Sequence, residues 1–167
     1  IRDASGNYAN ITHISVPDND TYMVDNTAPT LDNVSITSGI SCQGVQAGVI
    51  YCFAPPDGND GFNITAYFSE TVKVVIGRDD SGNVAPPTFD IQIASNDREA
   101  TYVSGNNSTE LVFRHMLLNG QNEDDDGSGI LIYANSLDLY NGGTIKDLAG
   151  NGVLTQSDNK TIAHRSS

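Results

Sequence analysis

The sequence predicts an all-β fold, an antiparallel β-sandwich, and three observations support this prediction. Apolar and polar residues alternate with a period of two in several short runs, and no run has a convincing 3.6-residue period. Segments rich in Gly, Pro, Asn and Asp separate these runs at roughly 8–12-residue spacing, which is typical of an all-β sandwich. Turn-forming and strand-forming residue types are abundant, whereas Lys and Glu are scarce.

The first predicted strand is residues 31–37, with Val34 and Ile36 facing inward and Asn33 facing outward. In the next run, 62–68, the apolar residues share one face, and Asn63 and Thr65 lie on the opposite, solvent-facing side. The same alternation predicts further strands at 72–76 (with Val72, Val74 and Ile76 on one face), 88–93, 99–103, 111–116, 130–132 and 137–139. Turn-rich segments at 54–61, 77–87, 104–108, 119–129 and 141–143 separate them.

The charge balance limits the classes of partner. The chain of 167 residues has 21 acidic and 8 basic side chains, a formal net charge of −13. Such a surface argues against nucleic acid or an anionic membrane as a partner. No apolar run approaches the length of about 20 residues that a spanning helix needs, so we expect no membrane insertion.

The two cysteines, Cys42 and Cys52, flank a Gly-containing stretch and predict a disulfide that closes a hairpin-like loop. Such a bridge would stabilise the fold by about 2–3 kcal/mol in the chain-entropy model. Two unlinked thiols are the alternative. A zinc or redox site is not indicated, because the chain has no CxxC motif or Cys/His cluster.

Asn-x-Ser/Thr sequons are numerous and predict a glycoprotein. A β protein rich in Asn and Thr can also accumulate sequons without using them. Together with the predicted disulfide, the sequons indicate an extracellular location, either at the cell surface or in a secreted fibre. The sequons are at Asn10, Asn19, Asn33, Asn63, Asn106, Asn107 and Asn159.

The two ends of the chain repeat each other. IRDASGN at 1–7 matches IKDLAGN at 145–151, so Asp3 and Asp147 should open equivalent turns. We therefore expect residues 1–23 to be the closing strand of a preceding repeat or a donor strand. Residues 24–30 are the predicted linker and residues 31–167 the sandwich domain. A chance match of a common turn is the alternative.

Four segments carry a resemblance to a known family: VDNTAPT, FNITAYFSETVKV, ATYVSGNNSTELVFRHML and NGQNEDDDGSGILIYANSLDLYNGGTIKDLAGN. In this order they resemble the Ig-like tandem repeat domain of giant extracellular surface adhesins and fibre proteins. The resemblance implies an Ig-like, Greek-key sandwich that serves as a structural bead without catalysis. The Cys42–Cys52 insertion, the loop at 54–61 and the sequons depart from typical bacterial members.

The repeated ends also predict how copies associate. If residues 145–160 complete the domain's own sheet, residues 1–16 have no groove in the same chain. We expect Ile1, Tyr8, Ile11 and Ile14 to pair with another copy or an adjacent repeat, because an unpaired strand is costly. The hypothesis is donor-strand assembly into a filament. The alternative is that 1–23 are simply part of a longer tandem array.

Calcium is the only cofactor that the sequence indicates. Asn122, Asp124 and Asp126 place oxygens as in the front half of a Ca²⁺ loop, although the distal acid is missing. A solvated acidic turn is the alternative reading. Two weaker candidates are the set Asp57, Asn59 and Asp60, and linker Asp25 with Asp3 or Asp147.

We expect no catalysis. The three histidines are scattered, and His115 is interpreted as a core or half-buried residue rather than a general base. The competing function is a calcium-dependent adhesive domain that binds glycan through the acidic loops 55–61 and 119–129. Tyrosines on the strands could supply a stacking surface for sugars, although strand tyrosines usually pack against neighbours.

Overall fold

The computed structural model describes residues 1–18, 21–37, 61–93, 95–117 and 130–153, together with the backbone of 45–46 and 49–50. This part of the chain contains strands and no helix, which confirms the predicted all-β class. The strands are β1 (Leu31–Thr37), β2 (Val45–Gln46), β3 (Val49–Ile50), β4 (Gly61–Val75), β5 (Gly77–Arg78), β6 (Val84–Ala85), β7 (Thr88–Ile93), β8 (Asn96–Ser104), β9 (Ser108–Met116), β10 (Ile130–Asp138) and β11 (Thr144–Lys146).

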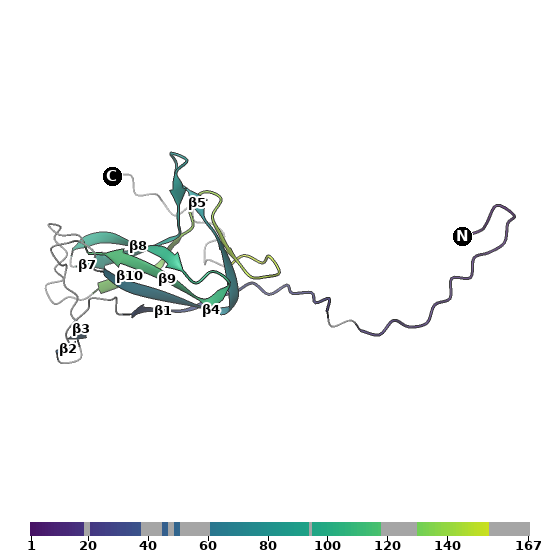
Figure 1. Ribbon diagram of the computed structural model, residues 1–167, viewed down its shortest axis with the longest axis horizontal. Coiled ribbons are helices and arrows are strands. Elements are labelled where there is room, and N and C mark those ends of the chain that lie inside the picture. Colours follow the sequence, from purple (N-terminus) through teal and green to yellow (C-terminus); the bar gives the residue numbers. More distant parts are fainter. Residues whose placement is uncertain are drawn as a thin grey trace.

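One curled antiparallel sheet forms the body of the molecule (Figure 1). Its strand order is β1-β4-β9-β8-β7-β10, and β11 pairs with the far half of β4. Within this path β1 and β10 are the two edge strands. The arrangement is that of a sandwich-like antiparallel class, and the Greek-key order of an Ig domain stays a prediction.

Strand β4 connects the two parts of the sheet. The register shifts between Tyr67 and Val72, so the strand bulges and bends there. The first half of β4 pairs with β1 on one side and β9 on the other, whereas its last residues pair with β11. The two runs predicted at 62–68 and 72–76 are therefore one continuous strand.

The core lies on the inner face of the sheet, where the alternating apolar residues meet. Phe113 is at its centre, with its ring centroid 4.6 Å from Phe89 and 5.8 Å from Tyr102, both in edge-to-face orientation. Such pairs contribute about 0.5–1.5 kcal/mol each beyond their area burial. The buried apolar cluster is Phe62, Ile64, Ala66, Phe68, Val72, Val74, Phe89, Ile91, Ile93, Ala100, Leu111, Phe113, Leu117, Leu137 and Ile145.

Three side chains differ from the predicted pattern. Ile36 was expected inside but is 43% exposed, because β1 is an edge strand and its end lacks a second neighbour. Ile76 was expected beside Val74, yet β4 ends at Val75 and Ile76 is also exposed. Thr65 was placed on the solvent face but is buried, and its hydroxyl lies 3.3 Å from that of Thr37.

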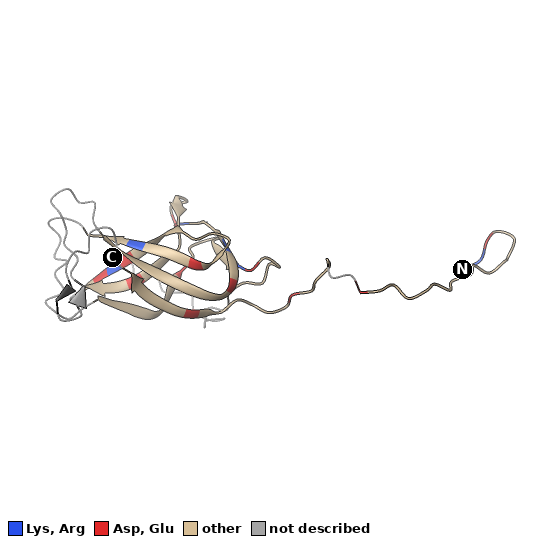
Figure 2. Ribbon diagram, turned by 60° about the horizontal axis from the view of Figure 1, so that its bottom comes forward, with Lys and Arg blue, Asp and Glu red and all other residues tan. Residues whose placement is uncertain are grey.

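Two features project from this body. The β5–β6 hairpin stands out from the sheet, and the N-terminal residues run away from it as a long extended arm (Figure 1). Neither projection adds a strand to the main sheet. Acidic positions lie on several strands of the body (Figure 2), as the net charge of −13 leads one to expect.

Candidate functional site

The N-terminal arm contains all four residues predicted to form the assembly strand. Ile1, Tyr8, Ile11 and Ile14 are 95%, 75%, 76% and 88% exposed. Within the described part of the arm, backbone pairing is limited to a bridge between Arg2 and Tyr8. The arm thus presents large apolar side chains to solvent along an extended backbone (Figure 1).

A compact turn at residues 3–7 shapes the tip of the arm. The Asp3 carboxylate accepts hydrogen bonds from the backbone N–H groups of Ser5 and Asn7 and from the Asn7 side-chain amide, each 2.9 Å long. The Asn7 side chain, followed by the backbone N–H groups, holds the pKa of Asp3 below its ordinary value. Gly6 has a φ of +87°, which a residue with a Cβ adopts only with strain.

The same turn recurs at residues 147–151, as the sequence repeat predicts. The Asp147 carboxylate accepts from the N–H groups of Gly150 and Asn151 at 2.6 and 2.7 Å, and from the Asn151 side-chain amide at 2.7 Å. The flanking backbone matches too. Val153 N–H donates to the Ile145 carbonyl at 2.9 Å, and in the arm Ala9 N–H donates to the Ile1 carbonyl at 2.9 Å.

The surroundings of the two turns are opposite. Ile145 pairs with Val74 of β4 and is only 1% exposed, whereas its counterpart Ile1 is 95% exposed. The two turns are therefore similar, although the first backbone donor is Ser5 in one and Gly150 in the other. The arm differs in that no described strand of the sheet pairs with it. Residues 145–153 show the docked form of a hairpin that residues 1–9 present undocked.

A third copy of the turn lies between β5 and β6. The Asp79 carboxylate accepts from the N–H groups of Ser81 and Asn83 and from the Asn83 side-chain amide, as Asp3 does in the arm. The turn-forming residues at 77–87 predict only a loop there. The signal was present, because RDDSGN at 78–83 repeats the pattern of RDASGN and KDLAGN.

The linker and the docked turn meet at a cluster of carboxylates, here called the acidic junction. It consists of Asp25, Glu70 and Asp147, whose carboxylate oxygens lie within 4.8 Å of one another. The Asn151 side-chain amide also donates to the carbonyls of Asp25 and Thr27, each at 3.2 Å. The predicted neighbourhood of Asp25 and Asp147 is thus present, whereas the N-terminal arm, to which Asp3 belongs, runs away from the body (Figure 1).

The acidic junction carries unfavourable electrostatics. Burial, followed by the nearby carboxylates of Asp25 and Asp147, raises the pKa of Glu70. Burial also raises the pKa of Asp147, but the hydrogen bonds from Asn151 and Gly150 outweigh it and leave this pKa below its ordinary value. Carboxylate oxygens are ligands that Ca²⁺ accepts, and these three residues could hold such an ion. Calcium binding stays a prediction.

The sequence alone does not predict Glu70 at the acidic junction. Its motif, FSE, was noted as part of the family resemblance and gave no spatial information. Glu70 follows the residue that binds the linker, since Ser69 exchanges hydrogen bonds of 3.0 Å with Thr30 through its N–H and its Oγ. This contact and the adjoining pairing of Leu31 with Phe68 are formed between segments distant in sequence, and they bring the glutamate to the linker.

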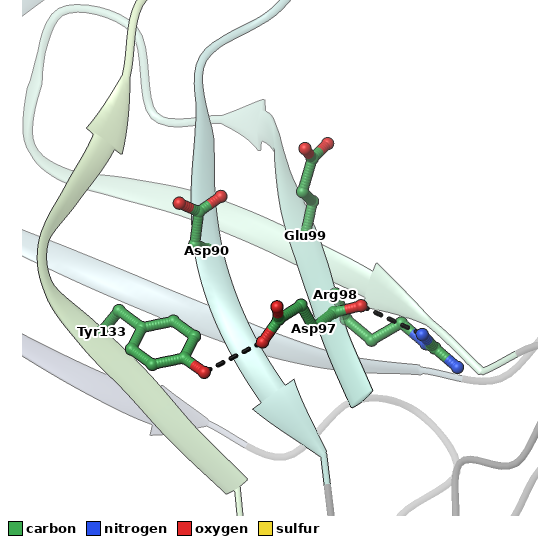
Figure 3. Close-up of a pocket in the computed structure, with 5 residues that line it drawn as sticks. All are labelled: Asp90, Asp97, Arg98, Glu99 and Tyr133. Carbon is green, nitrogen blue, oxygen red and sulfur yellow. Dashed lines mark hydrogen bonds between the residues drawn. The ribbon is translucent and has the colours of Figure 1, made fainter. Parts of the chain in front are cut away.

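A second acidic site is a cavity of about 580 Å³ lined by Asp90, Asp97, Arg98, Glu99 and Tyr133 (Figure 3). The Tyr133 hydroxyl donates to Asp97 at 2.9 Å. Asp90 and Glu99 face each other across β7 and β8, a pairing of like charges that destabilises a sheet. Burial, then Asp138 and Asp97, raise the pKa of Asp90.

His115 is buried, as the sequence predicts. Its Nδ1 lies 2.8 Å from the Glu99 carbonyl oxygen, and its ring centroid lies 5.5 Å from that of Phe62. The side chain therefore packs between strands and tethers β9 to β8. This position fits a structural residue.

The described sequon asparagines differ in accessibility. Asn10, Asn33, Asn106 and Asn107 are exposed, whereas Asn63 is half-buried in the middle of the sheet. Asn106 also has a structural task, because its side-chain oxygen accepts from the Val74 N–H at 2.9 Å. Occupancy of each sequon stays a prediction.

The remaining predicted site residues lie outside the described part of the chain. They are the disulfide pair Cys42 and Cys52, the sequons at Asn19 and Asn159, the calcium-loop residues Asn122, Asp124 and Asp126, and the oxygen-rich set Asp57, Asn59 and Asp60.

Comparison of the chain with protein-family models, curated proteins and solved structures finds no match. The resemblance to Ig-like adhesin repeats therefore stays a prediction from the motifs. In the described residues, no helix has the length and apolar character needed to span a bilayer.

Proposed function

We propose that this chain is a structural module of an extracellular filament or adhesin stalk. In this proposal the body is an Ig-like β-sandwich, and residues 1–16 pair as a donated β-strand with the sheet of another copy or an adjacent repeat. The module has no catalytic task. Its function is mechanical and depends on sheet hydrogen bonds between successive copies.

The observation behind the proposal is the contrast between two equal hairpins. Residues 1–9 and 145–153 share the same Asp-x-x-Gly-Asn turn and the same closing backbone bond, yet Ile145 is buried and Ile1 is exposed. Burying a large apolar side chain stabilises a fold by about 1.5–3 kcal/mol. Docking of the exposed arm on a sheet would therefore be favourable. In its own chain, the position beside β4 that such a hairpin would take is already occupied by β11.

The extracellular setting follows from other features. The predicted disulfide between Cys42 and Cys52 would persist only in an oxidising compartment. Sequons at Asn10, Asn33, Asn106 and Asn107 are sterically open. Both features fit a secreted or surface-displayed module.

Deletion of residues 1–23 tests the proposal. We expect the deleted chain to remain a folded monomer, since the core cluster contains no residue from this segment. The full chain should form regular filaments in negative-stain electron microscopy, with an axial repeat near one domain length. A matched control is Val84→Ser, which removes an apolar side chain that is 68% exposed on the β5–β6 hairpin and should leave assembly intact. Filaments formed by the deleted chain would show the donated-strand proposal to be wrong.

The competing function, calcium-dependent glycan binding, stays a prediction. It depends on the loops 55–61 and 119–129, of which the structure describes only Gly61.

A further inference from the structure

The proposed donated strand needs an acceptor, and the sheet has two edges. Strand β1 has only β4 beside it and strand β10 has only β7 beside it, among the strands that the structure describes. An edge strand exposes every second pair of N–H and C=O groups and can pair with another chain. We propose that β10 is the acceptor edge and that residues 8–16 of a second copy pair with it. This inference rests on the proposed function.

Strand β10 lacks the usual protection of an edge. Its sequence, ILIYANSLD, contains no Lys, Arg or Pro, and its single charge, Asp138, is at the end. Proteins commonly place such residues on edges to prevent pairing with other chains. The opposite edge, β1, carries a charge near its start at Asp32 and a sequon asparagine at Asn33, both exposed.

The side chains of β10 also favour an additional strand. Ile130 and Ile132 pack against the core but remain only partly buried, and Leu131 on the other face is 50% exposed. The register with β7 is regular from Ile130 to Ile132 and shifts only before Leu137. A strand paired with this regular, apolar stretch would place its own side chains beside those of β10 on each face of the sheet.

The arm matches this edge in length and reach. Residues 8–16 and strand β10 each comprise nine residues. Ile11, Ile14 and Val16 in the arm are exposed apolar or β-branched residues, which suit a strand. The fourteen residues 17–30 can span at most about 46–50 Å when extended, at 3.3–3.6 Å per residue, which allows the arm to cross a neighbouring module.

Matched substitutions on the two edges test the acceptor. Leu131→Lys on β10 and Ile36→Lys on β1 replace side chains of similar exposure, 50% and 43%, with the same charge. In the full chain, we expect Leu131→Lys to raise the concentration for half-maximal assembly by about tenfold or more, because an edge lysine opposes strand pairing. Ile36→Lys should leave it nearly unchanged. Circular dichroism and the Tm of the dilute monomer check that both variants fold.

Hydrogen exchange of the unmodified chain gives a second readout that does not depend on the variants. We expect amides of residues 130–138 to gain protection on assembly, relative to the dilute monomer, and those of 31–37 to gain none. Gain of protection at β1, with assembly lost in Ile36→Lys, would overturn the β10 inference and leave the proposed function standing. Full protection of the β10 amides already in the monomer would also overturn the β10 inference, since another segment of the same chain would then pair with this edge. Assembly without residues 1–23 would refute the proposed function itself.

Discussion

Asn151 illustrates at the residue scale how one turn sequence takes different tasks. In all three copies the asparagine side chain closes the turn on its aspartate, but only Asn151 also donates to the linker carbonyls of Asp25 and Thr27. It therefore joins the docked hairpin to the chain segment that precedes β1. Asn7, in the arm, donates through its side chain to Asp3 and stabilises its own turn.

Replacing these asparagines separates the two tasks. Asn151→Ala should lower the free energy of unfolding by about 1–3 kcal/mol, because it removes the partly buried hydrogen bond to the Asp147 carboxylate together with both bonds to the linker carbonyls. Asn7→Ala should change it by less than about 0.5 kcal/mol, the usual range for an exposed site. Urea unfolding of the dilute monomer measures both. Equal effects would mean that Asn151 does not hold the linker.

Glu70 is the residue through which pH acts on the acidic junction. Its folded pKa lies above the ordinary glutamate value of 4.5, so the folded chain holds this proton more tightly than the unfolded chain. Ionised Glu70 therefore destabilises the folded chain. This destabilisation is absent at pH values below 4.5, grows as the pH rises through the folded pKa, and is complete above the folded pKa.

Glu70→Gln should therefore raise the Tm at pH 7 in the presence of a chelator, and the gain should vanish below about pH 4. Glu110→Gln, at an exposed position on β9, changes the net charge equally and should not raise the Tm. Thermal scans across pH test this. A gain that persists in acid would point to packing rather than charge.

Adding Ca²⁺ to the unmodified chain tests the separate calcium prediction, which requires a Tm increase that Glu70→Gln weakens.

At the element scale, the sequence predicted strands better than it predicted their faces. The run LDNVSIT is β1 with the predicted bounds, because alternation and the flanking turn residues both act locally. Ile36 and Thr65 were assigned to the wrong environment, because burial depends on which strands stand beside β1 and β4. The sequence predicts two strands where the structure has the single strand β4. The reason is a bulge, which interrupts the alternation of apolar and polar residues without ending the hydrogen-bonded ladder.

The hairpins give the clearest case of local prediction. Asp3 and Asp147 each accept hydrogen bonds from the backbone N–H and the side-chain amide of the asparagine four residues on, because an Asp-x-x-Gly-Asn sequence encodes these bonds within five residues. Nothing in those five residues determines whether the hairpin is docked. That outcome depends on β4, whose residue Val74 pairs with Ile145. Val74 lies 73 residues before Asp147 and 71 residues after Asp3 in the sequence.

At the scale of the whole molecule, net charge and strand donation act against each other. A module with a net charge of −13 repels its copies, and this repulsion must be overcome wherever the arm docks on a neighbour. Acidic positions are spread over several strands (Figure 2), so the repulsion does not arise from one segment alone. Apolar arm residues such as Ile11 and Ile14 carry no charge and would supply the opposing attraction.

Salt should consequently promote assembly. Raising NaCl from about 0.02 M to about 0.5 M shortens the screening length several-fold and should lower the concentration for half-maximal assembly. Light scattering follows the transition, and the chain lacking residues 1–23 controls for non-specific salting out. Assembly that weakens with salt would instead mean that ion pairs hold the copies together.

The sequence by itself determined the all-β class, most strand positions and the repeated turn, because alternation and turn chemistry are properties of neighbouring residues. The Asp25–Asp147 neighbourhood could also be proposed from sequence, since the repeated ends place the linker next to the closing turn. Only the tertiary structure decided that Glu70 joins them, that Ile145 is buried while Ile1 is exposed, and that β1 and β10 are the edges of the described sheet. These outcomes depend on contacts between segments far apart in the chain, and no local pattern encodes them.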